Sequence, residues 1–466
     1  MPSKPGSLWE SVSAAGNTAG RLLGASAAPV SLADLARGSS LGGRLEELRG
    51  RSVLLALKDP LRAALAMLEL DGVAARMVLC PADLAPEHLP AIARGAGADA
   101  HVGDTDGPAA QIDGIRASIG IEPRLAPGAV ERRRSHATEW VLLTSGTTGV
   151  PKLVQHDLAT LTHALGDARR PPEGVVWATF YDIRRYGGLQ IFLRAVHLGS
   201  LVPAAPAEPV PEFLERARAA GVTHISGTPS HWRKLLMSGA AAMIAPRYVR
   251  LSGEIADQAV LDALRAAYPE ALVAHAFAST EAGVGFEVRD GLAGFPASLL
   301  DARDARVRLT AVDGTLHIGS GGNAHGYLGA EAATFPRAAD GAIDTGDRIE
   351  ERAGRYHFLG RAGGVINVGG LKVYPEEIEA VINAHPWVRM SLVRSRRNPI
   401  TGAVVVADIV LADETPGAAR PAPEVLTREL LHSCRQSLAP YKVPTAIRIV
   451  PALEVSASGK LVRPNA

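Results

Sequence analysis

Cysteine is scarce in this chain. Two occur in 466 residues, Cys80 and Cys434, and neither stands in a metal-binding or redox motif. Their scarcity excludes a scaffold held together by several disulfides. We therefore predict that both are buried free thiols in a reducing cytoplasm.

An excess of charge of either sign is also missing. Lys and Arg total 49 and Asp and Glu total 48, so no global field favours nucleic acid or an anionic membrane. Apolar runs are much shorter than a membrane span, and residues 1–32 lack the pattern of a signal peptide. The sequence thus predicts a cytoplasmic protein with no nucleic-acid or membrane partner, and it leaves monomer and homodimer open.

The chain is long enough for two or three domains. Strand-like apolar runs at 53–57 and 76–80 flank a helical pattern at 60–70 that has proline in its first turn. This β-α-β order predicts a parallel sheet covered by helices, and hence an α/β fold. A second α/β unit is predicted from Leu153 to about Ala293.

The later part of the chain changes character twice. Short alternating stretches between 305 and 360, separated by Asp-Gly and Gly-Gly turns, predict a small antiparallel β-subdomain. After residue 361, glycine pairs lead to a helix predicted to begin near Pro375. We therefore predict a large domain over 1–361 and a small α+β domain over 362–466.

The most informative stretch follows a predicted buried strand at 140–143. It consists of Thr144, Ser145, Gly146, Thr147, Thr148, Gly149, Val150, Pro151 and Lys152. Small hydroxyl side chains and glycines expose hydroxyls and backbone N–H groups to an anion, and the lysine adds positive charge. The spacing is not that of a Walker A loop. The stretch is either another kind of phosphate-binding loop, which we favour, or a flexible polar turn.

This loop resembles the signature loop of the adenylate-forming enzymes, which include acyl- and aryl-CoA synthetases, the adenylation domains of peptide synthetases and firefly luciferase. Further motifs follow in the order of that family: LSGE at 251–254, HAFASTE at 275–281, DTGD at 344–347, FLGR at 358–361 and SGK at 458–460. The resemblance covers essentially the whole chain. It implies ATP, Mg²⁺ and CoA as cofactors or co-substrates.

The resemblance assigns most residues of these motifs to the binding of ATP or AMP. They are Thr144, Ser145, Gly146, Thr147, Thr148, Gly149, Lys152, Ser252, Gly253, Glu254, Ala276, Phe277, Ala278, Ser279, Thr280, Asp347, Phe358, Arg361 and Lys460. Phe277 is expected to stack on adenine, and Asp347 to accept hydrogen bonds from the ribose hydroxyls. Ala278 stands where the family has glycine. Alanine is tolerated at this position unless the backbone there has a positive φ.

Three residues are implied to be catalytic: Thr280, Glu281 and Lys460. Thr280 offers a hydroxyl to phosphate, and Glu281 is the implied ligand of Mg²⁺, which prefers oxygen ligands. Lys460 is implied to bridge the substrate carboxylate and the phosphate. A lysine near a terminus is usually only solvated, but its place in Ser-Gly-Lys favours the catalytic role.

The family joins two half-reactions by rotating its small domain. The resemblance places the hinge at Gly363 and a tunnel for the thiol beside Gly369 and Gly370. The family usually has aspartate or lysine at the hinge. Because glycine restricts the backbone little, we predict a looser equilibrium between the two domain arrangements.

The acid pocket is assigned least firmly, to Tyr181, Asp182, Arg184, Tyr186, Gly227 and His231. Asp182 either holds a substrate ammonium, as in amino-acid-activating domains, or pairs with Arg184 or Arg185. Alternatively, Arg184 or Arg185 selects a second anionic group on the substrate. His231 is predicted to be a structural, hydrogen-bonding histidine rather than a catalyst. An aryl or medium-sized acid is favoured by four candidate aromatic residues of the pocket: Tyr181, Tyr186, Trp232 and Phe286.

The resulting prediction is an AMP-forming acid–CoA ligase. It activates a carboxylic acid to an acyl-adenylate with release of pyrophosphate, and then forms a thioester with CoA. The chain ends soon after Lys460, so the thiol is expected from CoA or from a separate carrier protein. A stand-alone adenylation enzyme that loads an acid or amino acid onto such a carrier is the alternative. A non-catalytic nucleotide-binding homologue is more remote.

Overall fold

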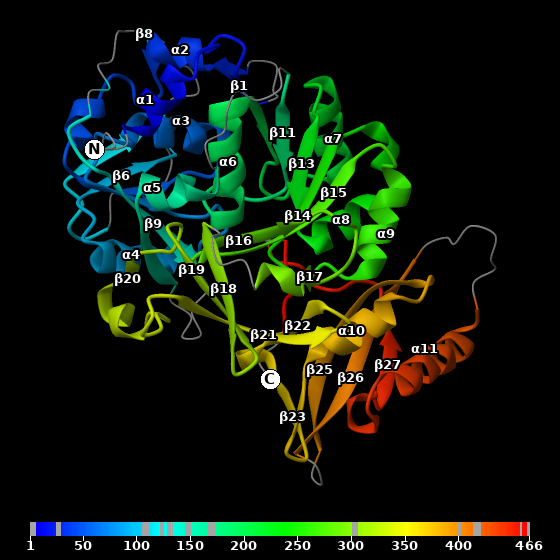
Figure 1. Ribbon diagram of the computed structural model, residues 1–466. Helices are drawn as coiled ribbons and strands as arrows, with labels where there is room; N and C mark the ends of the chain where they lie inside the picture. The colour runs from blue at the N-terminus through cyan, green and yellow to red at the C-terminus, as the bar shows by residue number, and fades with distance from the viewer. Residues whose placement is uncertain are drawn as a thin grey trace.

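The computed structural model describes residues 6–24, 29–104, 112–121, 125–127, 132, 134–144, 151–165, 174–300, 306–398, 402–412, 421–456 and 459–463. Two helix-covered sheets form the upper part of the molecule in Figure 1, the first in blue to cyan and the second in green. The C-terminal part, orange to red, lies below them. The predicted α/β class, with a large domain followed by a small one, is confirmed. The boundary at 361/362 stays a prediction.

The first sheet contains the strands predicted nearest the N-terminus. Its order is β20 (Gly326–Leu328), β10 (Lys152–His156), β9 (Glu139–Thr144), β5 (Arg76–Leu79), β4 (Ser52–Ala56), β6 (Ala100–Gly103) and β7 (Ala117–Gly120). Strands β9, β5, β4, β6 and β7 are parallel, whereas β10 and β20 are antiparallel additions at one edge. The strands predicted at 53–57, 76–80 and 140–143 are thus confirmed; both ends of the first and third differ by one residue, and the second differs by one residue only at its end.

The second sheet is built from residue 176 onward together with two short strands from near the N-terminus, rather than from Leu153 onward. Its order is β16 (Gly283–Val288), β15 (Leu272–Ser279), β14 (Tyr248–Ser252), β13 (His224–Gly227), β11 (Val176–Thr179), β12 (Ser200–Pro203), β1 (Leu22–Leu23) and β2 (Val30–Ser31). The predicted start at Leu153 is wrong, because Leu153 pairs with Leu143 and belongs to the first sheet. An apolar run indicates a strand but not its partner, and the partner decides which sheet the strand joins.

Helices cover both sheets. They are α1 (Leu8–Ala14), α2 (Leu32–Ala36), α3 (Pro60–Leu70), α4 (Leu89–Ala96), α5 (Leu158–Thr162), α6 (Tyr186–Leu198), α7 (Val210–Ala219), α8 (Pro229–Met237) and α9 (Gln258–Ala267). Helix α3 has the predicted bounds, because Asp59 caps it and Pro60 occupies its first position. Helix α6 shares one core cluster with both sheets.

The predicted antiparallel β-subdomain is present. Its strands run in the order β17 (Phe295–Pro296), β22 (Arg355–Arg361), β21 (Ile343–Arg352), β19 (Thr315–Ser320) and β18 (Val307–Val312). All neighbouring strands in it are antiparallel. Strand β20 leaves this region and extends the first sheet through its pairing with β10.

The small domain has its own apolar core. It contains β23 (Ile366–Val368), β24 (Leu371–Val373), α10 (Pro375–Asn383), β25 (Val388–Asn398), β26 (Gly402–Leu411), α11 (Pro423–Ser437) and β27 (Ala446–Ile449). Helix α10 begins at Pro375 as predicted. Short 3-10 helices, including Ala362–Gly364 directly after β22, connect several of the elements of both domains.

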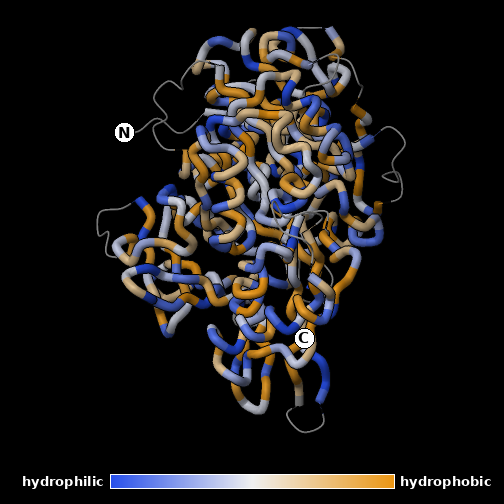
Figure 2. Tube along the Cα trace, turned by 90° about the vertical axis from the view of Figure 1, so that its right-hand side faces the viewer, coloured by the Kyte–Doolittle hydropathy of each residue, from blue (hydrophilic) through white to orange (hydrophobic). Residues whose placement is uncertain are grey.

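The composition of the chain matches this burial. In Figure 2 hydrophobic positions alternate with hydrophilic ones along the chain, as expected where elements bury one face. Cys80 and Cys434 are buried free thiols, as predicted, and burial raises the pKa of Cys434 to about 11. Within the described ranges, the helices are too short or too polar for any of them to traverse a lipid bilayer.

Candidate active site

Lys460 lies on one of two paired antiparallel segments of the small domain, 454–456 and 459–462, which we call the lysine hairpin. Val462 N–H donates to Glu454 O at 3.0 Å, and Val455 and Leu461 form a β-bridge. Inside the hairpin, Ser456 Oγ donates to Lys460 O at 3.0 Å. These local hydrogen bonds fix the backbone conformation around Lys460.

The hairpin docks against the large domain. Thr228 Oγ1, at the N-cap of α8, donates to Gly459 O at 2.6 Å. Leu461 N–H donates to Glu254 Oε1 at 3.1 Å, and Glu254 also accepts from Ser230 N–H at 2.9 Å. Glu254, predicted to border the adenine, therefore also links the large domain to the lysine hairpin.

The predicted nucleotide residues surround Lys460. A Cβ placed on Gly253 would lie 3.5 Å from Lys460 Cε, and the backbone of Gly253 has a φ of +88°. Partial loss of hydration and the charge of Arg361 lower the pKa of Lys460, while Glu254 and Asp347 act in the opposite direction. The side chain keeps exposed surface, so water screens part of these charges.

Asp347 and Arg361 face each other across β21 and β22. Arg361 Nε donates to Asp347 Oδ1 at 3.2 Å, whereas Asp347 Oδ2 is buried and has no hydrogen-bond partner among the described residues. Burial raises the pKa of Asp347, although Arg361 and Lys460 oppose the shift. A buried carboxylate oxygen without a donor is costly, and a ribose hydroxyl would satisfy it.

Phe277 and Phe358 lie face to face. Their ring centroids are 5.2 Å apart with an interplanar angle of 10°, and Phe286 stacks on Phe277 at 5.8 Å. These rings come from β15, β16 and β22. Ala278, between Phe277 and Ser279 on β15, does not have a positive φ, so the condition for tolerating alanine there is met.

Two residues that the sequence patterns did not identify hold the Thr280–Glu281 turn. His156 Nε2 donates to Thr280 O at 2.8 Å, and Tyr327 OH donates to Glu281 Oε1 at 2.9 Å. Burial lowers the pKa of His156 to about 4, so the ring is neutral at pH 7 and Nε2 carries its proton. Neither residue belongs to a recognisable motif, because each acts through a fold-dependent contact.

Only the ends of the predicted phosphate loop can be placed. Thr144 and Lys152 are paired across β9 and β10. Lys152 Nζ lies 4.8 Å from the centre of the Tyr327 ring and 3.8 Å from Glu331 Oε2. Ser145, Gly146, Thr147, Thr148 and Gly149 lie outside the described residues.

In the predicted acid pocket, Asp182 is occupied by protein groups. Arg184 Nε donates to Asp182 Oδ1 at 2.6 Å, and Ala82 N–H donates to Asp182 Oδ2 at 2.9 Å. Arg185 pairs instead with Asp83 at 2.7 Å. Of the two pairings considered for Asp182, only that with Arg184 forms. Both carboxylate oxygens therefore already have donors, which argues against an ammonium site.

Three aromatic residues of this region are buried in the apolar cores of the large domain. Trp232 is fully buried and its indole N–H donates to Arg250 O, so it is a core residue rather than a pocket wall. Tyr181 OH donates to Ser252 O at 2.7 Å, within the LSGE motif at 251–254 that is predicted to bind the nucleotide. Tyr186 is buried at the first position of α6.

His231 lies under the lysine hairpin and has the predicted hydrogen-bonding character. It stacks on Phe180, with centroids 5.3 Å apart, and its Nδ1 contacts Thr228 Oγ1 at 3.0 Å. Burial lowers the pKa of His231 to about 3, so the ring is neutral. A Cβ on Gly227 would meet Phe180 Cδ2 at 2.9 Å.

The residues assigned to domain motion lie in two places, the 3-10 helix after β22 and the turn between β23 and β24. Gly363 is in the 3-10 helix Ala362–Gly364, and a Cβ there would meet nothing within 4 Å. Gly369 and Gly370 form the exposed turn between β23 and β24, at the lower end of the molecule in Figure 1.

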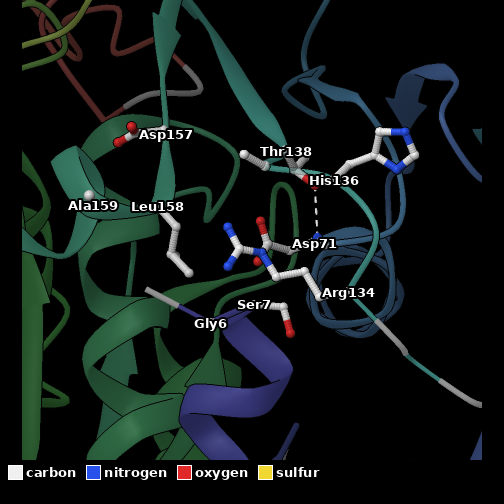
Figure 3. A pocket seen from close by; sticks show the side chains of 11 residues that line it. Gly6, Ser7, Asp71, Arg134, His136, Thr138, Asp157, Leu158 and Ala159 are labelled. Atoms are coloured by element: carbon white, nitrogen blue, oxygen red, sulfur yellow. Dashed lines mark hydrogen bonds between the residues drawn. The ribbon is translucent and has the colours of Figure 1, made fainter. Parts of the chain in front are cut away.

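A separate cavity of about 60 Å³ lies between α1, α3 and α5. Figure 3 shows Arg134 reaching into it beside Asp71, while the ring of His136 is turned away. Asp71 already accepts from Leu8 N–H at 2.6 Å and Trp140 Nε1 at 2.7 Å. None of the predicted nucleotide residues that the structure describes lines this cavity, so it is not the candidate site.

Known proteins resemble this chain in sequence and in fold. The 2-succinylbenzoate–CoA ligase of Bacillus cytotoxicus is 28% identical over 341 residues, which cover 69% of this chain and 68% of that protein. Human mitochondrial acyl-coenzyme A synthetase ACSM5 is 41% identical over 120 residues, 26% of this chain and 20% of the human enzyme. The anthranilate CoA ligase AuaEII, solved with anthranoyl-AMP, superimposes with a TM-score of 0.81 at 17% identity, covering 98% of this chain and 95% of that one.

Family models agree with these relatives. The model of the AMP-binding enzyme C-terminal domain matches residues 377–460, which include Lys460. The model described as AMP-binding enzyme matches residues 33–328, more than half of the chain. The protein therefore belongs to the AMP-binding enzyme family.

Proposed function

We propose that this protein is an AMP-forming acid–CoA ligase whose substrate is an aryl or medium-sized carboxylic acid. The observation that carries the proposal is the position of Lys460, which approaches Gly253 from another domain and interacts with Asp347 and Arg361. Relatives named as 2-succinylbenzoate–CoA ligases support an aryl acid. The Phe180–His231 stack beneath the lysine hairpin supports it as well.

In the first half-reaction, a carboxylate oxygen of the acid attacks the α-phosphorus of ATP and pyrophosphate leaves. Two anions approach each other, so fixed positive charge and donors lower the barrier. Protonated Lys460 supplies one such charge between them. Asp347 orients the ribose through Oδ2, which no described residue contacts by a hydrogen bond, and Phe277 and Phe358 border the base.

Mg²⁺ fits this site through Glu281. The described residues contain no cluster of three or more side chains able to ligate a metal. A half-buried carboxylate whose Oε1 is fixed by Tyr327 suits an ion that takes most of its ligands from phosphate and water. When bound there, the ion supplies positive charge to the triphosphate. His156 holds the backbone beside it through Thr280 O.

In the second half-reaction, the thiol of CoA attacks the acyl carbon and AMP leaves. We propose that the small domain, from residue 362 onward, rotates about Gly363 between the steps. A separate carrier protein is the alternative thiol donor. The oligomeric state, monomer or homodimer, and the cytoplasmic location stay predictions.

Pyrophosphate release tests the proposal. We would supply ATP, Mg²⁺ and a panel of aryl, aliphatic, dicarboxylic and amino acids, each with and without CoA. Turnover with one acid class, raised by CoA and lowered about 10²- to 10³-fold in Lys460→Ala, is the expected result. Lys58→Ala, which changes an exposed lysine, is the control and should keep normal turnover.

Two other results would replace the proposal. A burst of about one turnover that does not depend on CoA, with the adenylate retained, would identify a carrier protein as the acceptor. Silence with every acid, together with ATP binding by calorimetry, would favour a non-catalytic homologue.

A further inference from the structure

Arg463, three residues after Lys460, binds two acidic side chains of α10. Its Nη1 donates to Glu379 Oε1 at 2.8 Å and its Nη2 to Glu379 Oε2 at 2.7 Å. Its Nη2 also lies 3.5 Å from Glu376 Oε1. Paired parallel hydrogen bonds of this kind fix the orientation of a guanidinium as well as its distance.

Glu379 is a rigid anchor for this arginine. Its side chain is only 8% exposed, and its Oε1 also accepts from Val393 N–H of β25 at 2.8 Å. The carboxylate is thus held by both α10 and β25 before it meets Arg463. The charges of Glu379 and Glu376 raise the pKa of Arg463, so the arginine stays charged throughout the working pH range.

Glu376 connects the same arginine to the nucleotide site. Gly360 is the residue directly before Arg361, and a Cβ on it would clash with Glu376 Oε2. Burial raises the pKa of Glu376, and the nearby charge of Asp347 adds to the shift. Arg463 therefore compensates acidic charge next to the carboxylate that is expected to bind ribose.

We propose that Arg463 is a positioning residue for Lys460, with Glu379 as its anchor; the proposal rests on the proposed function. The bonds from Thr228 and Leu461 join the hairpin to the large domain and are lost when the small domain rotates. The Arg463–Glu379 pair lies within the small domain and moves with it. It keeps the hairpin in the shape that returns Lys460 to the same place.

The first test separates the two half-reactions in Arg463→Met. Adenylate formation should fall about 10²-fold, because small displacements of a catalytic group are costly, while transfer from preformed acyl-adenylate to CoA should stay within about twofold of normal. Arg463→Lys should lie between, since an ammonium cannot form the paired bonds. Equal losses in both half-reactions, or no loss in either, would overturn the proposal.

Arg448→Met is the matched control. Arg448 also binds a carboxylate of the small domain with two donors, Nε to Asp408 Oδ1 at 2.7 Å and Nη2 to Asp408 Oδ2 at 3.0 Å. It is separate from the hairpin of Lys460. Both half-reactions should be normal in this variant.

A double-mutant cycle tests whether Arg463 acts through the lysine. In Lys460→Ala, the further change Arg463→Met should lower the residual adenylation less than about twofold. A further large loss would overturn the positioning role. If Arg463→Met does not fold, Arg463→Gln combined with Glu379→Gln removes the two charges of the bidentate pair together.

A last measurement is independent of catalysis. A lysine-specific protease should cut after Lys460 faster in Arg463→Met than in the wild type or Arg448→Met, with mass spectrometry following the loss of residues 461–466. Equal rates would overturn the anchoring. Because this readout needs no acid substrate, a failure of the proposed function remains distinguishable from a failure of the Arg463 proposal.

Discussion

Gly459 controls the position of the neighbouring lysine. Its φ is +75°, and a Cβ there would lie 1.7 Å from Cε1 of His231. A larger residue therefore faces both an unfavourable backbone conformation and a ring that is held by Thr228 and Phe180. Glycine lets the hairpin approach α8 closely enough to place Lys460 beside Gly253.

We expect Gly459→Ala to lower adenylate formation about 10²-fold, because the hairpin must move away from His231. Transfer of a preformed acyl-adenylate to CoA should change little. Rapid-quench measurement of each half-reaction checks this. Gly354→Ala is the control, since Gly354 has a φ of +76° but open space around its Cβ position; equal effects of the two substitutions would contradict the explanation.

At the scale of elements, His156 joins the two sheets of the large domain. It ends β10 in the first sheet, and its Nε2–H group reaches Thr280 O between β15 and β16 of the second sheet. The ring is fully buried, and burial lowers its pKa to about 4. The unfolded chain should titrate near the ordinary histidine value of about 6.5.

This difference predicts a loss of stability in acid. Between pH 6.5 and 4 the unfolded state binds more protons, so the free energy of unfolding falls as pH drops through that window, by up to about 3 kcal/mol. Denaturant unfolding at several pH values measures the slope. Since glutamine does not titrate, His156→Gln should have a shallower slope than the wild type; identical slopes would show that His156 is not responsible.

At the scale of the whole molecule, several contacts hold the small domain in the arrangement that brings Lys460 to the site. Besides the hairpin bonds, Asn383 Nδ2 donates to Asp257 Oδ2 at 3.4 Å, and Arg352 of β21 lies 3.6 Å from Glu377 of α10. Partly exposed polar contacts of this kind are individually weak. We therefore expect a second domain arrangement to be accessible at modest cost.

Gly363 is expected to set how freely the two arrangements exchange. Because nothing lies within 4 Å of a Cβ at Gly363, Gly363→Asp should fold normally while restricting the backbone. We expect this substitution to change the ratio of the two half-reaction rates several-fold, with a melting temperature near normal. Pre-steady-state rates of both steps measure it, and unchanged rates would refute a hinge role for this glycine.

The local elements could be predicted because their signals are local. Helix α3 has a capping Asp59, Pro60 at its first position and regularly spaced apolar residues, and its bounds match the prediction. The predicted start of the second α/β unit at Leu153 was wrong because the sequence of β10 fits a strand of either sheet. Its partner β9 and the distant β20 decide the matter.

The sequence by itself determined the α/β class, the two free thiols and, through its resemblance to a known family, which residues to seek at an ATP site. Only the tertiary structure showed that Lys460 lies beside Gly253, that Arg184 binds Asp182, and that His156 and Tyr327 hold the Thr280–Glu281 turn. Thr228 and Gly459 stand 231 positions apart, and Tyr327 and Glu281 stand 46 apart. No periodicity or motif spans such distances, so these contacts exist only once the sheets and the small domain have packed together.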